Sequence, residues 1–194
     1  MPFLILLAAL AFPFAADAHM LATDTGFMSG LKHPVLGLDH LLAMLSVGLV
    51  STQIGGRAIW TVPSTFVLVM ALGAVVGILH LVEIPEGLIE FGIALSVAAL
   101  GFSVASERKF RPLVAMGFVG FFALFHGYAH GKEMPELAEP LHFALGFMTG
   151  TAAIHIAGVA IGLFAANLKD GPSNLRYIGA GISGAGFFML AEML

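Results

Sequence analysis

The residues best suited to chemistry in this chain are imidazoles and carboxylates set within apolar segments. One stretch reads FHGYAHGKE, and its His126, His130 and Glu133 lie at positions i, i+4 and i+7, so that a helix presents them on one face. Two histidines four residues apart on a helix can bind a single metal ion with both imidazoles. The stretch therefore predicts three metal ligands.

A second stretch, HPVLGLDH, carries His33, Asp39 and His40 near the start of another apolar segment. A continuous helix would place its two histidines on one face two turns apart, and Pro34 suits the first turn of such a helix. An Asp side chain within a membrane span is costly unless it meets a cation, a hydrogen-bond donor or water. We therefore expect the two stretches to face each other across one metal site, with Asp39, His40, His126 and His130 at its centre.

Imidazole and carboxylate donors suit borderline divalent ions such as Ni²⁺, Co²⁺ or Zn²⁺, whereas Mg²⁺ prefers oxygen ligands. The chain has no Cys, which excludes thiolate sites and disulfides. Met44 lies one turn after His40 and offers a soft thioether, but packing is its favoured role. The alternative interpretation of the central residues is a buried, hydrogen-bonded Asp–His pair that holds two helices together.

Five further residues are candidates for a secondary metal site or a transport pathway. His80, Glu90 and His142 fall at the ends of apolar segments, where an ordinary interfacial position is the alternative. His155 lies about 20 Å along its segment, past the expected membrane midplane. His19 would offer an imidazole and an α-amine together if it became the mature amino terminus; the alternative is a frayed terminal residue.

The composition places these groups in a membrane. Of the 194 residues, 59% are hydrophobic and 10% are charged, against about 25% charged in a soluble domain, and the mean hydropathy is +0.98. So few charges cannot cover a soluble surface, and disorder requires low hydrophobicity. The 8 Lys and Arg residues and the net charge of −4 argue against nucleic-acid binding. The expected partners are a divalent metal ion and the lipid bilayer.

Six apolar segments of membrane-spanning length position the candidate residues. They run approximately over 34–54, 58–80, 87–105, 112–131, 141–166 and 177–194. None alternates with period two, so the predicted fold is all-α: a polytopic membrane protein with a bundle of six transmembrane helices in one domain over 19–194. Glycines at small-xxx-small spacing, such as Gly73 and Gly77, predict close helix packing.

The amino-terminal residues 1–18 have the pattern of a cleaved signal peptide. An apolar run over 2–16 leads into Ala16-Asp17-Ala18, which matches a small-x-small cleavage site. The run is preceded by no Lys or Arg, and the alternative is an uncleaved first membrane helix. Cleavage would leave His19 as the first residue, outside the cytoplasm.

Loop charges predict the orientation. The loops after the first, third and fifth segments hold six of the 8 basic residues, and by the positive-inside rule they face the cytoplasm. Both ends of the mature chain then lie outside. The opposite loops are acidic, which is either simply tolerated there or serves as a weak funnel for cations.

The stretches HPVLGLDHLLAM and FHGYAHGKEMPE resemble the two histidine motifs of the HupE/UreJ family of bacterial membrane proteins. The resemblance extends to the leader followed by His, the six short spans and the run GGRAIW. It implies a secondary permease of the bacterial inner membrane that imports Ni²⁺, with Co²⁺ as a second candidate, for metalloenzymes such as NiFe hydrogenase or urease. The motif positions correspond to His33, Asp39 and His40 and to His126, His130 and Glu133.

We expect no catalysis and no tightly bound cofactor, the metal ion being the transported substrate. No Walker motif is present, so the chain does not itself use ATP. Two other functional classes are the alternatives. An intramembrane metalloenzyme lacks support because no HExxH occurs. A di-haem electron carrier would place His at both membrane depths, whereas only His155 lies deep.

Overall fold

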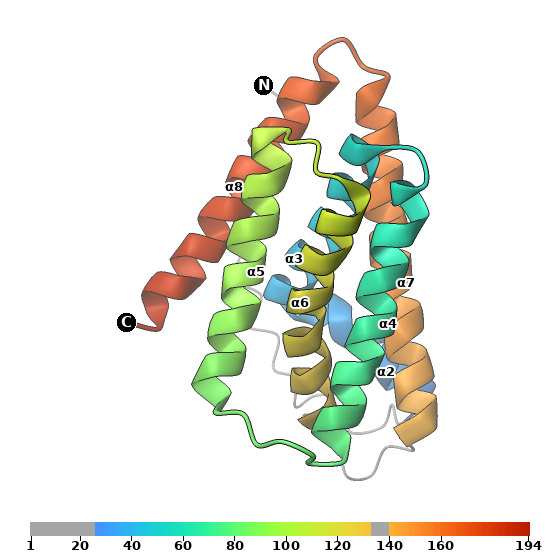
Figure 1. Ribbon diagram of the computed structural model, residues 1–194, viewed down its shortest axis with the longest axis vertical. Helices are drawn as coiled ribbons and strands as arrows, with labels where there is room; N and C mark the ends of the chain where they lie inside the picture. Colours follow the sequence, from blue (N-terminus) through green and yellow to red (C-terminus); the bar gives the residue numbers. More distant parts are fainter. Residues whose placement is uncertain (1–25, 133–139) are drawn as a thin grey trace.

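The computed structural model describes residues 26–132 and 140–194, and within these ranges it consists of α-helices without strands (Figure 1). The all-helical prediction is confirmed. The leader 1–18, His19 and Glu133 lie outside the described residues. The helices are α2 (Phe27–Leu36), α3 (Leu38–Ile54), α4 (Ala58–Ile78), α5 (Glu86–Ser106), α6 (Pro112–Lys132), α7 (Pro140–Ala166) and α8 (Gly171–Glu192).

Four described helices, α4 to α7, are long and apolar enough to cross a membrane, and α2 with α3 makes a fifth span if the bent pair is counted as one. Large apolar side chains such as Leu68, Phe102 and Phe164 point outward, where lipid would cover them. This is the architecture of a multi-pass membrane protein. Helix α8 is less apolar, and the count of six spans stays a prediction.

The first predicted segment is not one helix, which corrects the expectation of a continuous helix over 34–54. Helices α2 and α3 meet at 85°, and the break falls at Gly37, whose backbone is extended. Pro34 lies inside α2 and not in a first turn. A β-carbon on Gly37 would lie 2.9 Å from Oδ1 of Asp39 and 3.1 Å from Nδ1 of His40. Glycine at this position therefore leaves room for the Asp39 and His40 side chains beside the bend.

Glycines bring the helix backbones into contact, as their spacing predicts. Any β-carbon on Gly127 would overlap the carbonyl oxygen of Met70, and one on Gly131 would overlap that of Ala74, so α6 lies directly on α4. Gly48 of α3 packs in the same way on the backbone of α7. Because hydrophobicity gives no helix–helix attraction in lipid, such close contacts supply much of the packing.

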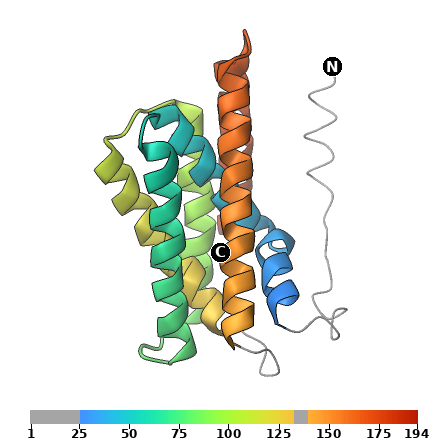
Figure 2. The ribbon, with the colours of Figure 1, turned by 90° about the vertical axis from the view of Figure 1, so that its right-hand side faces the viewer.

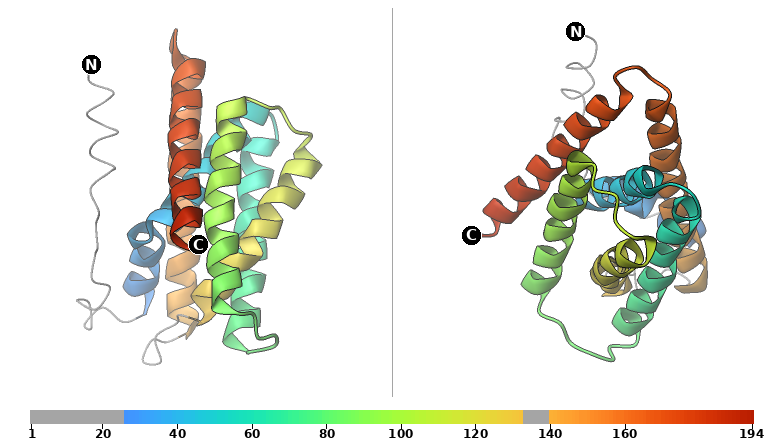
Figure 3. Two further views of the ribbon diagram at one scale, coloured as in Figure 1. Left: turned by 90° about the vertical axis from the view of Figure 1, so that its left-hand side faces the viewer. Right: turned by 45° about the horizontal axis from the view of Figure 1, so that its top comes forward.

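Helix α3 runs through the middle of the bundle, with α5 and α8 on one side and α4, α6 and α7 on the other (Figure 3). Helix α2 lies beside the first half of α7 (Figure 2). The loops 55–57, 107–111 and 167–170 share one end of the bundle, which we call the basic end (Figure 1). The opposite end holds the loop 79–85, the starts of α5 and α7 and the end of α6, and we call it the acidic end; α8 ends short of it.

Candidate metal-binding site

Four imidazoles from α2, α3 and α6 pack against one another, and three of them are buried. The ring centroids of His40 and His126 are 4.7 Å apart, those of His40 and His130 are 4.4 Å apart, and those of His33 and His130 are 4.8 Å apart. His126 and His130 are buried, and His40 is 7% exposed. The structure thus brings the two predicted motifs together.

The glycines of the second motif explain why its histidines face α3. Gly127 and Gly131 each follow a histidine directly and pack on α4. Successive residues in a helix are rotated by about 100°, so the preceding His126 and His130 project to the side of this contact, where their rings pack against His40 of α3. In each pair the glycine allows α6 to pack closely on α4, and the histidine before it projects into the candidate site.

Asp39 fixes the orientation and the tautomer of His40. Its Oδ1 lies 2.7 Å from Nδ1 of His40 and also accepts a hydrogen bond of 2.7 Å from the His40 backbone N–H. An ionised carboxylate only accepts hydrogen bonds, so Nδ1 of His40 carries the proton and Nε2 carries the lone pair. Nε2 is buried and has no hydrogen-bond partner among the described residues. Carboxylates hold metal-binding imidazoles in this manner.

Ser96 plays the corresponding role for His126. Its hydroxyl donates to the carbonyl oxygen of Ile93 at 2.6 Å, and its Oγ lies 2.9 Å from Nε2 of His126. Both contacts form together only when Nε2 donates its proton to Oγ, because a hydroxyl has one hydrogen to give. Nδ1 of His126 then carries the lone pair, and within the described parts of the chain this atom has no hydrogen-bond partner.

These two lone pairs fit a borderline divalent ion, because neutral imidazole nitrogen is a preferred ligand of Ni²⁺, Co²⁺ and Zn²⁺. The rings of His40 and His126 pack edge to face, at 88°. Within residues 26–132 and 140–194, no three His, Asp or Glu side chains already surround a common point. Side-chain rotation is therefore needed before one ion can be held by several of these groups.

A cavity of about 680 Å³ leads from the acidic end to Asp39 and His40. It lies between α3, α5, α6 and α8. Besides Asp39, three carboxylates line it, those of Glu86, Glu90 and Glu192, together with the amine of Lys132. The acidic lining supplies the negative potential that concentrates cations in a cleft with low-dielectric walls. Glu90, one of the predicted pathway residues, lies on this wall.

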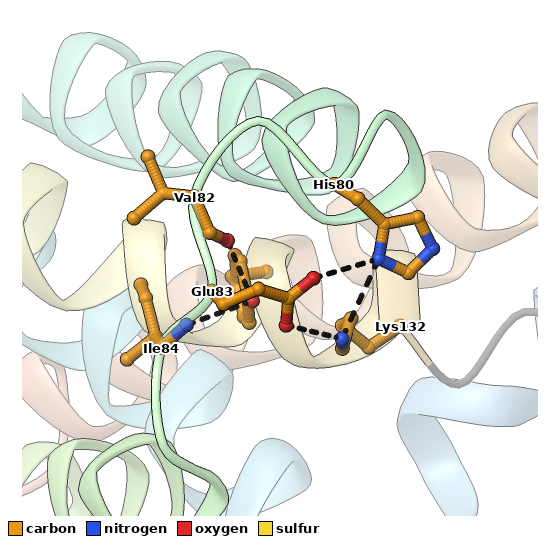
Figure 4. A network of polar contacts seen from close by, with 6 residues as sticks. His80, Val82, Glu83, Ile84 and Lys132 are labelled. Atoms are coloured by element: carbon orange, nitrogen blue, oxygen red, sulfur yellow. Dashed lines mark hydrogen bonds and ion pairs between the residues drawn. The ribbon is translucent and has the colours of Figure 1, made fainter.

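Tyr128, between the two histidines of the second motif, anchors the loop between α4 and α5. Its hydroxyl donates to the carbonyl oxygen of Val82 at 2.9 Å and accepts from the backbone N–H of Ile84 at 3.1 Å (Figure 4). The motif therefore also ties this loop to α6.

His80 belongs to a separate surface network on the same loop. Its Nδ1 lies 3.1 Å from Oε1 of Glu83, and Nζ of Lys132 donates to Oε2 of Glu83 at 2.9 Å (Figure 4). The hydrogen bond from Lys132, aided by His80, lowers the pKa of the Glu83 carboxyl below its usual value. All three side chains are substantially exposed, so this network lies at the surface and not among the packed imidazoles.

The remaining predicted residues are dispersed. His142 is exposed in the first turn of α7, and His155 is buried deep in the same helix, with its ring centroid 5.1 Å from that of Phe66. Met44 is fully buried in the hydrophobic core, in agreement with its predicted packing role.

Two residues near the motifs escaped the sequence analysis. Ser96 contacts His126 across 30 residues, and a serine in a helix interior carries no sequence pattern that announces such a contact. Glu192 is the last residue of α8, and its membership of the cavity depends on where that helix lies. The one indication of this position in the sequence is that an acidic residue lies near the end of an apolar segment.

Comparisons with known proteins agree with the two motifs. A family model described as HupE / UreJ protein matches residues 6–189. The chain is 42% identical over 187 residues to "Protein HupE" of Rhizobium leguminosarum bv. viciae, an alignment that covers 95% of this chain and 94% of that protein. No solved structure matches the chain.

Proposed function

The chain belongs to the HupE/UreJ family, and from this premise we propose that it is a secondary importer of a divalent transition-metal ion. The proposed substrate is Ni²⁺, with Co²⁺ as the alternative, because the donors suit both ions. The proposed location is the bacterial inner membrane, with the acidic end toward the periplasm and the basic end toward the cytoplasm, as the positive-inside rule requires. The imported ion would serve nickel enzymes such as a hydrogenase or a urease.

One observation carries the proposal. Nε2 of His40 and Nδ1 of His126 are buried nitrogens without hydrogen-bond partners among the described residues, in rings whose other nitrogens are held by Asp39 and Ser96. An unsatisfied polar atom costs free energy in the interior of a membrane protein, and more so when its ring is held in place. A cation that both nitrogens can bind supplies the missing partner.

The cavity supplies the approach to this site. In the proposed mechanism a hydrated cation is attracted by Glu86, Glu90 and Glu192, loses part of its water and reaches Asp39 and His40. His126 and His130 then complete its coordination from α6, after rotation of the packed rings. Glu133 and His33 are proposed to bind the ion earlier, at the rim.

The test is uptake of ⁶³Ni²⁺ by cells that express the full chain or its variants at equal membrane abundance. We expect His40→Ala and His126→Ala each to reduce uptake at least about tenfold, as loss of a ligand does at metal sites. His80→Ala is the matched control, because its contacts are with Glu83 and Lys132 at the surface, and it should retain most of the uptake. Wild-type uptake rates in both His40→Ala and His126→Ala would refute the proposed site.

Competition by unlabelled ions then assigns the cargo. Excess Co²⁺ or Zn²⁺ that suppresses ⁶³Ni²⁺ uptake as strongly as excess Ni²⁺ would show that the site does not discriminate. Suppression by Ni²⁺ and Co²⁺ is expected, since the donors suit both ions, and the effect of Zn²⁺ shows whether the site also admits that ion.

A further inference from the structure

We infer that Lys132 competes with the incoming cation for the carboxylates of the acidic cavity, and that Glu83 limits this competition by holding the Lys132 ammonium at the cavity mouth. The inference rests on the proposed transport function and adds to it a pair of residues that sets the affinity for the external ion. Neither residue is among the proposed metal ligands.

Lys132 carries a positive charge where the proposed substrate must pass. It is the last residue of α6, and it lines the cavity of about 680 Å³ together with Glu86 and Glu90. Of the described residues that line this cavity, it is the one with a Lys or Arg side chain. Because an ammonium and a divalent cation are attracted to the same carboxylates, this lysine is a competitor that the protein itself supplies.

The position of Lys132 at the end of a helix does not explain its place on the cavity wall. A cation in the last turn interacts favourably with the helix dipole on any face of the helix. By the positive-inside rule, a lysine is also the less expected residue at the acidic end. Its place on the cavity wall is explained, however, if its charge acts on the cations that enter there.

The loop between α4 and α5 positions Glu83 beside this lysine (Figure 4). Nζ of Lys132 donates to Oε2 of Glu83 at 2.9 Å. The hydroxyl of Tyr128 binds the carbonyl oxygen of Val82 and the backbone N–H of Ile84, the residues on either side of Glu83. Tyr128 and Lys132 lie one turn apart on the same face of α6, so the tyrosine fixes the Glu83 backbone relative to the lysine.

Pairing with Glu83 reduces the competition in two ways. Of the described acids, the one that forms an ion pair with Lys132 is Glu83, which does not itself line the cavity. The ammonium is therefore held away from Glu86 and Glu90, and beside a carboxylate it presents little net charge to an approaching ion. Without Glu83, the flexible four-carbon stem of Lys132 would allow its ammonium to pair with the cavity carboxylates.

The competition serves transport because a cavity with several unopposed carboxylates would retain a divalent ion. Clusters of carboxylate oxygens are the sites in which proteins hold such ions firmly. Transport requires binding that is weak enough to let the ion leave. A tethered ammonium lowers the affinity of the cavity without coordinating the ion, since it has no lone pair.

The experiment measures initial rates of ⁶³Ni²⁺ uptake over a range of external concentrations, in cells that express the full chain or its variants at equal membrane abundance. We expect Lys132→Gln to lower KM about threefold and to change the maximal rate less than about twofold, because charges at a rim mainly alter capture. Lys132→Arg, which retains the charge, should keep the wild-type KM. Lys109→Gln is the matched control, because Lys109 is exposed in the loop at the basic end.

A double-mutant cycle tests whether Glu83 acts through Lys132. We expect Glu83→Gln alone to raise KM about threefold, because it releases the ammonium toward the cavity. When Glu83→Gln is combined with Lys132→Gln, this increase should vanish and the KM of Lys132→Gln should remain. If Glu83 acts only through its own negative charge, the two effects cancel in the double variant. A wild-type KM there would overturn the role of Glu83.

The outcomes separate this inference from the proposed function. If the wild type takes up no Ni²⁺, the transport function fails. The competition is then tested by Ni²⁺ titration of the purified full chain, in which Lys132→Gln should bind about threefold more tightly and an unchanged affinity overturns the inference. If the wild type transports but Lys132→Gln keeps its KM, the competition is overturned while transport stands.

Ionic strength provides an independent check on the electrostatic cause. The Debye length falls from about 30 Å at 0.01 M salt to about 8 Å at 0.15 M. The difference in KM between wild type and Lys132→Gln should therefore shrink over this range. A difference that does not depend on salt, or an equal change of KM in Lys132→Arg, would contradict a competition between charges.

Discussion

Polar side chains near the acidic end are paired with one another, whereas His155, nearer the basic end, lies among apolar side chains. In the first region Asp39 holds His40, Ser96 holds His126, and a carboxylate-lined cavity adjoins them. In the second, one imidazole without a hydrogen-bond partner among the described residues packs against a phenylalanine ring. Near the acidic end the donors are numerous and held in fixed orientations, and nearer the basic end they are few.

The helices differ between the regions in the same sense. The first span is broken at Gly37, directly beside Asp39 and His40, while farther along α3 the chain is regular and Gly48 lies against the backbone of α7. Irregular backbone in a membrane is stable only where it is buried in protein or lines a cavity. The comparison therefore locates the costly features of the fold in the region where an incoming ion would first be dehydrated.

The largest effect is expected from breaking the packing that orients the second motif. Gly127→Leu would place a side chain in the backbone of α4 at Met70, so we expect little folded protein, measured as the monodisperse fraction in detergent. Gly117→Leu, on the same helix but with open space around it, should fold normally. Normal recovery of Gly127→Leu would show that α6 can be seated on α4 without this contact.

The second-largest effect is expected from removing the negative charge of Asp39, which orients His40. Asp39→Asn keeps the shape of the side chain but removes the negative charge that strengthens the hydrogen bond from Nδ1 and raises the basicity of Nε2, so we expect Ni²⁺ affinity to fall by about 10- to 100-fold. Titration calorimetry of the purified protein measures this. Glu107→Gln, an exposed acid in the loop after α5, is the control. An unchanged affinity in Asp39→Asn would leave the alternative, a pair that only holds helices together.

A smaller effect is expected from removing the hydroxyl of Ser96, the neutral hydrogen-bond partner of His126. Ser96→Ala removes the acceptor for Nε2–H, which frees the ring to change tautomer, and we expect Ni²⁺ affinity to fall about threefold. Ser103→Ala, whose hydroxyl bonds only its own helix at the carbonyl of Ala99, should leave affinity unchanged. Equal affinities for the two variants would mean that Ser96 does not select the tautomer.

The smallest effect is expected in the exposed network of Glu83. Its pKa is lowered by the hydrogen bond from Lys132, so the contribution of this pair to stability is fully present above the unfolded value of 4.5 and is lost as the pH falls through the lower folded value. Glu83→Gln should therefore lower the melting temperature slightly at pH 7, and the difference from wild type should shrink under acid conditions. A difference that grows in acid would contradict the assigned direction.

The helices could be predicted wherever a long apolar run defines them, whereas the bend at Gly37 could not. Segments predicted at 87–105, 112–131 and 141–166 match α5, α6 and α7 to within a residue at each end. The run over 34–54 is equally apolar, and only the position of α2 against α7 shows that the chain turns at Gly37. A hydropathy profile shows how long an apolar run is, but it does not show whether the chain bends within that run.

The motif residues could be proposed from their spacing, but their partners could not. Four histidines and Asp39 stand out because ionisable groups are rare in apolar segments. Ser96 and Phe66 do not stand out, because serine and phenylalanine are common in membrane helices and their contacts with His126 are fixed by tertiary packing. The sequence therefore indicates the candidate cation-binding groups, whereas their orientation is set by the fold.

The bend at Gly37 also bears on how the chain is inserted during synthesis. Helix α2 has 10 residues and α3 has 17, which correspond to about 15 and 26 Å at 1.5 Å per residue, while the hydrocarbon core is about 30 Å thick. Helix α2 is too short to cross the bilayer, and α3 is at the lower limit for a spanning helix. Helix α2 is held by α7, through Gly30 and Gly146, and α7 leaves the ribosome much later. Helix α2 therefore reaches its final contacts only after the fifth predicted segment has been synthesised.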